Sequence, residues 1–335
     1  MKISAIIDTY NYGRYLPAAV ESVLAQEVPG HELEVIIVDD GSTDATAAIA
    51  AAYAGRARYI RKENGGQGSA FNAGFAAASG DIFCMLDADD SWEPGKLAKV
   101  AAAFVSDPGL GLVRHYMADM DAQGNPLPPP ASVSLPADGD APGLLRSRLF
   151  TIGTSALSFR ASALRPLLPV PDKVRICPDE YLFSLLVLRS KVLTIPEFLS
   201  RRRLHPANSG LYGHNLLNPA NLRAFISTRE TLDASLLEAI KANGSEPEKD
   251  FFSLSQAHVA RARVLLSSIE GNKAAAFSAA ASWLSRSGCG AYAIFKFSTM
   301  LLAAASPRLY AAVFSFYDRS SRPAALRRSL SGGTR

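Results

Sequence analysis

The sequence predicts an α/β protein with a helical C-terminal extension, and three observations support this prediction. Over the first half of the chain, short apolar runs alternate with amphipathic segments. Two of the apolar runs end in clustered acids, which is typical of strand ends at the ligand-binding edge of an open sheet. From about residue 216 to residue 317, apolar residues recur with helical spacing.

The alternation in the first half gives a defined order of elements. Strands are expected at residues 2–7, 34–38, 57–61, 82–86 and 111–117. Helices are expected at residues 16–26, 44–53, 69–78 and 96–105. This order predicts a mainly parallel sheet with helices on both faces. After a Pro-rich loop at 121–142, we expect a strand at 154–160, a short helix at 161–168 and a helix opening at Pro178.

Length and composition set limits on the class of protein. A chain of 335 residues with 48% apolar residues suggests one large domain, at 1–210, and a helical region with a basic tail, at 211–335. The net charge of +4 and the absence of a basic stripe with aromatics argue against a nucleic-acid partner. Three widely spaced cysteines and no signal peptide or membrane span predict a reducing, cytoplasmic location.

The strand expected at 82–86 is followed directly by the acids Asp87, Asp89 and Asp90. Crowded carboxylates repel one another unless a cation joins them, and hard divalent ions prefer oxygen ligands. The pattern therefore suggests a site for Mg²⁺ or Mn²⁺ shared with substrate phosphates. The alternative interpretation is an acidic turn that caps the next helix.

A second acidic strand end contains Asp39 and Asp40. Acids at this edge can accept hydrogen bonds from a base or a ribose. The first strand ends in Thr9, whose hydroxyl is a potential ligand, and Tyr10, whose ring could stack on a base; a plain turn is the alternative.

Two further segments carry polar chemistry. The glycines of NGGQGSAFNAG, residues 64–74, let backbone N–H groups approach an anion, although a flexible loop would look the same. Asp179 and Glu180 open an apolar helix, where either catalysis or the helix dipole explains acids.

Taken in order, TYN, VDDGSTD, NGGQGSAFNAG, LDADDSWEPGKL and PDEYLF resemble motifs of the family 2 glycosyltransferases over about residues 1–210. The resemblance implies a glycosyltransferase A-type fold, with a nucleotide-binding sheet flanked by helices. It also implies these donor-binding residues: Thr9, Tyr10, Asp39, Asp40, Asn72, Asp87 and His205.

The resemblance further implies that Asp89 is the metal ligand and Asp179 the general base. Family members commonly read Glu-Asp at the base, so Glu180 stays an alternative to Asp179. Many members carry Arg where this chain has Phe71, so a phosphate or base contact is expected to be missing here.

The function implied is a metal-dependent inverting transfer of a sugar from a nucleoside-diphosphate sugar, with a UDP-sugar favoured, to a glycan or lipid-linked acceptor. A role in cell envelope polysaccharide synthesis would follow. The alternatives are a sugar-phosphate nucleotidyltransferase and a catalytically silent nucleotide-sugar-binding protein. The basic, aromatic C-terminal end is explained by packing or, alternatively, by peripheral contact with the inner face of a membrane.

Overall fold

The computed structural model describes residues 1–128, 153–205, 217–242, 244, 246–247, 251–287 and 290–319. The chain divides into two compact units, Met1–His205 with Ser235–Ser245, and Pro206–Ala234 with Glu246–Arg335. The boundary expected at residue 210 lies outside the described residues and stays a prediction, as does most of the loop expected at 121–142.

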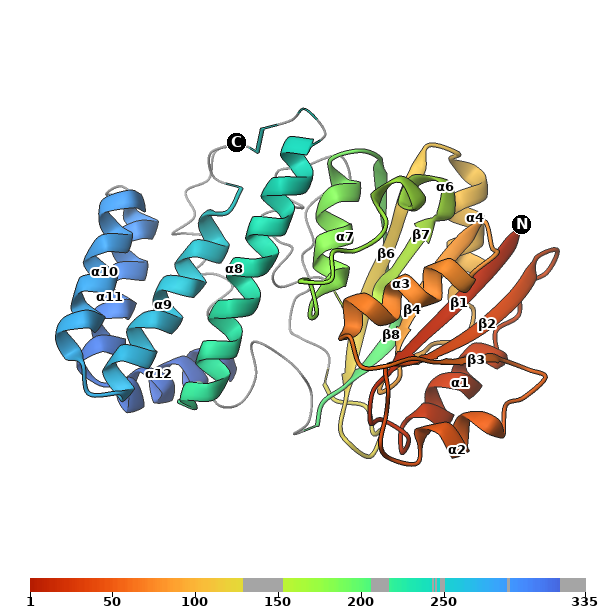
Figure 1. Cartoon of the computed structure of the whole chain (residues 1–335), viewed down its shortest axis with the longest axis horizontal. Coiled ribbons are helices and arrows are strands. Elements are labelled where there is room, and N and C mark those ends of the chain that lie inside the picture. Colours follow the sequence, from red (N-terminus) through yellow and green to blue (C-terminus); the bar gives the residue numbers. More distant parts are fainter. Residues whose placement is uncertain are drawn as a thin grey trace. The chain divides into compact units, whose positions relative to one another are not determined.

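One sheet forms the centre of the first unit (Figure 1). Within the described residues its eight strands follow the order β3 (Arg58–Arg61), β2 (Glu32–Asp39), β1 (Lys2–Thr9), β4 (Ile82–Asp87), β7 (Leu157–Arg160), β6 (Leu110–Met120), β8 (Lys191–Arg203) and β5 (Ser91–Trp92).

The sheet is mixed but mainly parallel, as expected, because six of its eight strands in the described residues run in one direction. The first four strands in this order pair in parallel, and β8 pairs in parallel with β6. However, β7 runs antiparallel to both of its neighbours, and β5 runs antiparallel to β8. The short β7 thus lies between two parallel groups of strands that run in the same direction.

Strand β8 was not predicted from the sequence. Its run KVLTIPEFLSRRR contains a proline and ends in three arginines, which hides the usual apolar pattern. The ladder with β6 passes from Ile195 to Phe198 between adjacent partners His115 and Tyr116, so Pro196 falls in an irregularity of the ladder. This strand carries Arg203 to the edge at which the acids lie.

Helices cover both faces of the sheet, as predicted (Figure 1). One face is covered by α1 (Leu16–Leu24), α2 (Thr46–Ala51) and α4 (Lys96–Ser106). The other is covered by α3 (Gln67–Ala77), α6 (Ala161–Leu164) and α7 (Pro178–Val187), with the turns η1 (Thr154–Ala156) and η2 (Arg165–Leu167) beside them. Alternation along β1 explains this, because Ile3, Ala5 and Ile7 join the first core while Ile6 lies under Gly74 of α3.

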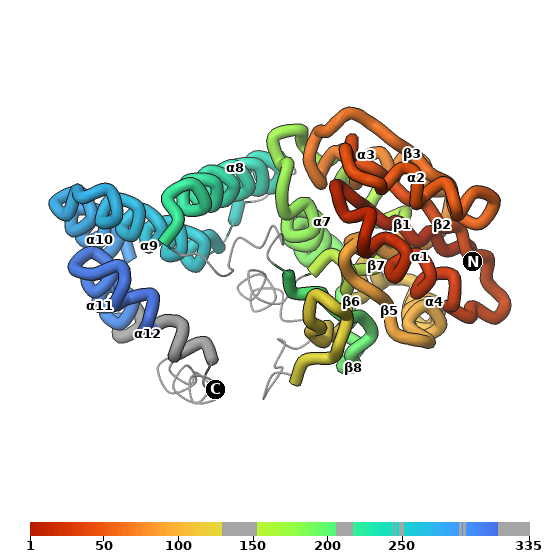
Figure 2. Tube along the Cα trace, turned by 90° about the horizontal axis from the view of Figure 1, so that it is seen from below, coloured from red at the N-terminus to blue at the C-terminus, as the bar shows by residue number. Residues whose placement is uncertain are grey.

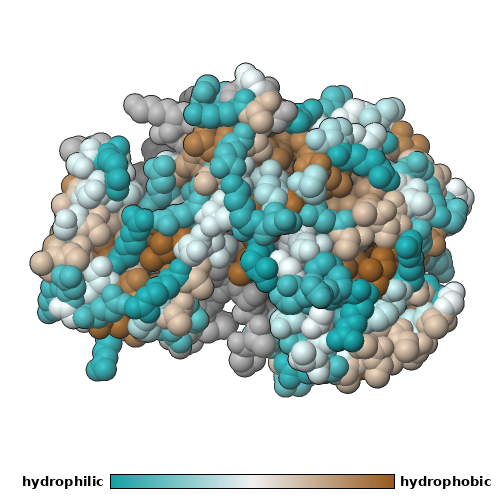
Figure 3. Space-filling view, viewed as in Figure 1, coloured by the Kyte–Doolittle hydropathy of each residue, from teal (hydrophilic) through white to brown (hydrophobic). Residues whose placement is uncertain are grey.

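The second unit is helical, as expected. It contains most of α8 (Pro219–Ala242), together with α9 (Ser253–Ile269), α10 (Lys273–Ser287), α11 (Ala291–Ala305) and α12 (Pro307–Arg319) (Figure 2). Val264, Trp283 and Met300 belong to its apolar core. Hydrophilic side chains are spread over the face seen in Figure 3. Among the described helices, none combines the length and apolarity needed to cross a bilayer.

Candidate active site

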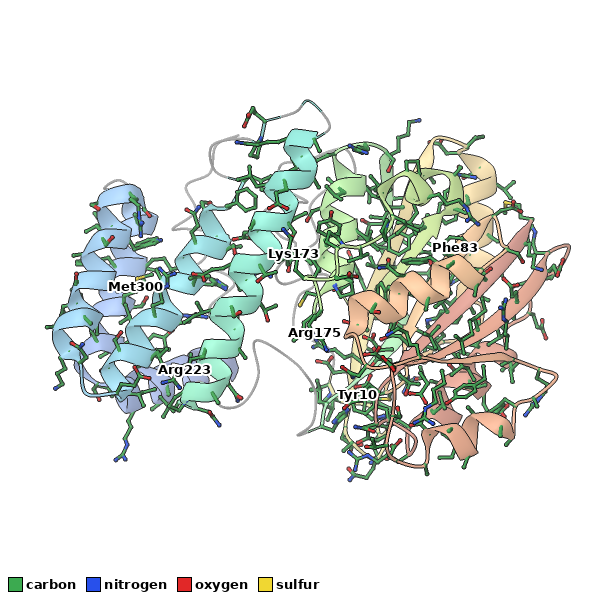
Figure 4. The ribbon with its side chains drawn as sticks, in the orientation of Figure 1. Tyr10, Phe83, Lys173, Arg175, Arg223 and Met300 are labelled. Atoms are coloured by element: carbon green, nitrogen blue, oxygen red, sulfur yellow. The ribbon has the colours of Figure 1, made fainter. Side chains whose placement is uncertain are left out.

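The carboxyl ends of β1, β2 and β4 lie in register and bring the predicted residues to one edge. Thr9 is opposite Asp39, and Asp8 is opposite Asp87. Because these strands are parallel and adjacent, their polar ends converge at one place. Tyr10 follows with an exposed ring, and in Figure 4 it lies on the same side of the first unit as Arg175. Thr9 is buried, and its hydroxyl oxygen has no hydrogen-bond partner among the described residues.

Asp39 and Asp40 hold the surrounding loops. The fully buried Asp39 carboxylate accepts hydrogen bonds from the Ser42 N–H at 2.8 Å and the Tyr59 hydroxyl at 2.6 Å. The Asp40 carboxylate accepts from Lys62 Nζ at 2.8 Å and from the Gly65 and Gly66 N–H groups at 3.0 and 2.7 Å. Asp40 thus anchors the glycine-rich loop at this edge, while its predicted contact with a base stays a prediction.

The glycine-rich loop has no room for a side chain at two of its positions. Gly66 has φ +87°, and a Cβ there would lie 2.7 Å from the Arg175 carbonyl oxygen. A Cβ on Gly68 would lie 2.1 Å from the Val174 carbonyl oxygen. The loop is therefore pressed against the segment that leads into α7.

Asn72 and Phe71 both make packing contacts within the first unit. The Asn72 amide donates to the Val170 carbonyl and accepts from the Val170 N–H, each at 2.8 Å. Phe71 is fully buried and packs edge-on against Phe75 at 5.7 Å. Position 71 is thus part of the core, and these contacts assign the Asn72 amide to α3 packing. Its donor contact is not tested by them.

The acids after β4 form one cluster. One carboxylate oxygen from each of Asp87, Asp89 and Asp90 lies within 4.8 Å of the others. The capping interpretation does not hold for them, because α4 begins at Lys96 with Gly95 as its N-cap and no side-chain cap. Asp90 instead accepts from the Ser155 hydroxyl at 2.6 Å and the Arg203 N–H at 2.9 Å.

Asp89 is held from the end of β8. His205 Nε2 lies 2.9 Å from Asp89 Oδ2, and Arg203 Nε donates to the Asp89 carbonyl at 2.9 Å. The imidazole is buried between two rings, with centroids 5.3 Å from Tyr12 and 4.8 Å from Tyr15. His205 is therefore placed at the acidic cluster, while its predicted contact with a diphosphate stays a prediction.

Burial and mutual repulsion raise the pKa of several of these acids. Burial, and next the charge of Asp89, raises the pKa of Asp90 to about 8. Burial raises the pKa of Asp8 to about 7, while hydrogen bonds with Asp87 and Gln67 lower it. The pKa of Asp87 lies well above its usual value because of burial and then the charges of Asp8, Asp90, Asp89 and Asp179.

The donor set fits a hard divalent cation. All the groups are carboxylates, and one buried oxygen of Asp8 has no hydrogen-bond partner among the described residues. Oxygen ligands at this spacing suit Mg²⁺ or Mn²⁺, and a cation would relieve the repulsion that raises the pKa of these acids.

Asp179 and Glu180 occupy the first turn of α7, after Pro178. The Asp179 side chain is half-buried, with the Glu180 N–H and the Thr154 hydroxyl near its carboxyl group. Burial raises its pKa to about 6. Because its charge acts on Asp87, Asp179 belongs to the same electrostatic cluster as the acids after β4.

Sequence reasoning missed four polar residues in this cluster: Gln67, Thr154, Ser155 and Arg203. Gln67 was hidden in the glycine-rich loop, and Arg203 in a strand that was not predicted. Thr154 and Ser155 follow Gly153 just before a predicted strand, and a hydroxyl pair at such a position was the signal available.

Comparison with known proteins decides the family. Residues 4–157 match the family model for Glycosyl transferase family 2. An uncharacterized glycosyltransferase from Nostoc sp. (strain PCC 7120) is 36% identical over 221 residues, which cover 62% of this chain and 66% of the relative. Residues 4–157 therefore belong to glycosyltransferase family 2. The chain spans less than two thirds of the Nostoc glycosyltransferase and 29% of one from Rickettsia prowazekii, which is 42% identical over 95 residues covering 28% of this chain.

Solved structures share the fold of this chain. A crystal structure of S. aureus TarS residues 1–349 in complex with UDP-GlcNAc has a TM-score of 0.54 at 20% identity, with 90% of each chain covered. The mannosyltransferase PcManGT from Pyrobaculum calidifontis, in complex with GDP-Man and Mn²⁺, has a TM-score of 0.52 at 19% identity and covers 95% of this chain and 88% of its own. The glycosyltransferase A-type fold predicted from the sequence is confirmed.

Proposed function

We propose that this chain transfers a sugar from a nucleoside-diphosphate sugar to an acceptor hydroxyl, with inversion at the anomeric carbon and with a divalent cation. One observation carries the proposal: Asp179 lies within electrostatic reach of the acidic cluster at the end of β4. The proposed base and the proposed cation site thus belong to one electrostatic cluster.

Asp89, with Asp87 beside it, would hold Mg²⁺ or Mn²⁺. When bound, such an ion neutralises charge on the departing diphosphate. The His205–Asp89 contact fixes the orientation of the Asp89 carboxylate. Asp90 has both of its oxygens engaged by Ser155 and Arg203, so it is better suited to shape the turn than to bind a ligand.

Asp179 is the base in this proposal. A sugar hydroxyl is too weakly acidic to ionise beforehand, so Asp179 accepts its proton as the new C–O bond forms and the bond to the diphosphate breaks. The attack comes from the side opposite the leaving group, so the anomeric centre inverts and no covalent carboxylate intermediate is needed. Asp179 is favoured over Glu180 because its carboxyl group interacts electrostatically with the Thr154 hydroxyl and with Asp87.

The nucleotide is proposed to lie over Thr9, Tyr10 and the loop held by Asp40. The exposed ring of Tyr10 is available to stack on a base, and the buried Thr9 hydroxyl is available to a polar group. The TarS structure contains UDP-GlcNAc and the PcManGT structure GDP-Man. These support a nucleotide-sugar donor, and a UDP-sugar is our first choice.

The acceptor is proposed to be a glycan or a lipid-linked saccharide of the cell envelope. Peripheral contact with the inner face of a membrane and a cytoplasmic location remain predictions from the sequence. The membrane contact rests on the basic C-terminal end, of which Arg322, Arg327, Arg328 and Arg335 lie outside the described residues.

The proposal is tested with the full-length chain and a panel of UDP- and GDP-sugars, with Mn²⁺ or with EDTA. We expect nucleoside diphosphate release with at least one donor, lost in EDTA and restored by Mn²⁺. Asp89→Ala should abolish this release. Exposed Gln123→Ala lies in a surface turn and serves as the control. Donor binding without turnover in wild type would favour a silent binding protein, and pyrophosphate release from nucleoside triphosphate would favour a nucleotidyltransferase.

A further inference from the structure

Gln67 occupies a central position among the acids of the site. It is the first residue of α3, and its side-chain amide nitrogen lies 2.9 Å from Asp87 Oδ1 and 3.3 Å from Asp8 Oδ2. The same nitrogen lies 3.4 Å from Thr154 Oγ1. An amide has two N–H donors and no charge, so one N–H serves Asp87 and the other is shared by Asp8 and Thr154, without neutralising the carboxylates. Gln67 therefore joins the ends of β1 and β4 to η1.

Thr154 continues this connection toward α7. Its side chain is buried, with 3% of its surface exposed. A hydroxyl has one donor and two acceptor positions, so Thr154, which accepts from Gln67, still has its O–H to donate toward the nearby Asp179 carboxylate. The direction of donation is consistent along the chain of contacts, from the amide to the hydroxyl to the acid.

We infer that Gln67 and Thr154 form one hydrogen-bonded bridge that fixes the Asp87 carboxylate relative to the Asp179 carboxylate. The inference rests on the proposed function, in which Asp87 lies beside Asp89 at the cation and Asp179 is the base. Both bridge residues are positioning residues, because they act through the two acids.

A neutral bridge suits this site better than a charged one. A lysine at position 67 would compete with a divalent cation for Asp87, and a glutamate would add another like charge to the cluster. The amide instead holds Asp87 while leaving its charge available. Its position is itself fixed, because α3 begins at the loop that Asp40 anchors and that packs against Val174.

The bridge predicts different results for Thr154→Val and Thr154→Ser. Valine keeps the shape of threonine but removes the hydroxyl, and a misplaced base costs about 10- to 100-fold in kcat. Serine restores the hydroxyl, so kcat should return to within about threefold of wild type. The donor KM and the Kd for UDP with Mn²⁺, measured by calorimetry, should stay within about twofold for both variants. Thr299→Val, which removes a hydroxyl that bonds only to a backbone carbonyl in α11, is the matched control.

A double-mutant cycle tests whether the two residues act together. Gln67→Met keeps the length of the side chain and removes its donors, and should lower kcat by at least about 10-fold. If the bridge is one unit, the kcat of the double variant Gln67→Met with Thr154→Val should be no more than about threefold below that of the less active single variant. Multiplied losses would mean two independent roles and would overturn the inference.

Three other results would overturn it. One is wild-type kcat in Thr154→Val. Another is a loss in Thr154→Val that Thr154→Ser does not repair. The third is a Kd for UDP with Mn²⁺ weakened more than about tenfold in folded Thr154→Val, since the whole site would then have changed. These outcomes leave wild-type transfer intact, so they differ from failure of the proposed function, in which wild type turns over no donor and both proposals fall.

Discussion

At the scale of single residues, the acids of this site are distinguished by the groups around them, since all of them carry the same carboxylate group. Asp90 accepts hydrogen bonds from Ser155 and Arg203, Asp89 is oriented by His205, and Asp179 lies near the hydroxyl of Thr154. Similar carboxylates can therefore have different roles because each is given a different set of hydrogen bonds. This separation is what makes single substitutions informative.

Asp179→Asn should abolish transfer while leaving the fold and the donor site intact. The amide is similar in shape but cannot accept a proton from the acceptor hydroxyl, and the loss of a general base typically costs 10²- to 10⁴-fold. We expect kcat to fall within that range, with a melting temperature close to that of wild type. Glu180→Gln is the comparison variant, and a larger loss in Glu180→Gln than in Asp179→Asn would move the base to Glu180.

Transfer should depend on pH through the same carboxylate. Burial raises the pKa of Asp179 to about 6, and only its deprotonated form can accept a proton. The rate kcat should therefore increase with pH through about 6 and level off above about 7, at saturating donor and Mn²⁺. A rate that is flat from pH 5 to pH 8 would contradict the assignment.

At the scale of elements, the sequence predicted the parts of the site that lie on regular strand ends. The acids at 39–40 and 87–90 follow apolar strands, and the strands expected at 2–7, 34–38 and 82–86 are β1, β2 and β4. Parallel pairing then brings their ends together, and this required only the alternation of strands and helices. Asp179 could likewise be placed at the first turn of a helix, because an apolar helical segment follows it.

The remaining part of the site depends on a long-range pairing that local patterns do not encode. Strand β8 carries Arg203, and His205 follows it; both reach Asp89 across more than a hundred residues. The proline and arginines in β8 resemble a loop, and only its pairing with β6 and β5 makes it a strand. Likewise, the motif around Asn72 predicts a donor-binding residue, but no local pattern predicts that its amide bonds to Val170, 98 positions away.

Asn72→Ala tests the structural role of α3 directly. The substitution leaves the N–H and carbonyl of Val170 without their partner, and a lost pair of buried hydrogen bonds costs about 1–3 kcal/mol. We expect the free energy of unfolding in urea to fall by about that amount, with the donor KM within about twofold of wild type. A raised donor KM at unchanged stability would instead support the predicted contact between Asn72 and the donor.

At the scale of the whole molecule, the described residues that form the candidate site all belong to the first unit, which ends its main segment at His205. The last residues of that segment are site residues, because Arg203 and His205 close the acidic cluster. The second unit has a separate apolar core. Under the proposed function, acceptor choice or membrane contact could therefore vary in this unit without changing the acidic cluster.

The acidic cluster should also make the stability of the protein depend on pH and on a divalent cation. Asp8 and Asp90 have pKa values raised to about 7 and about 8, from 3.8, so near neutral pH the folded chain holds more protons than the unfolded chain. The free energy of unfolding must then fall as the pH increases. Below about pH 6.5 the depressed pKa values of His115 and His258 act in the opposite direction, so the window for this test is pH 6.5 to 8.

In EDTA, the free energy of unfolding should fall by about 1–2 kcal/mol between pH 6.5 and pH 8, because each bound proton contributes about 1.4 kcal/mol per pH unit. Mn²⁺ competes with those protons for the carboxylates, so it should raise the melting temperature more at pH 8 than at pH 6.5. Urea unfolding and thermal melting measure the two effects. Asp90→Asn, which mimics the neutral acid, should reduce the slope in EDTA. A stability that increases over this window in EDTA would contradict the burial of these acids.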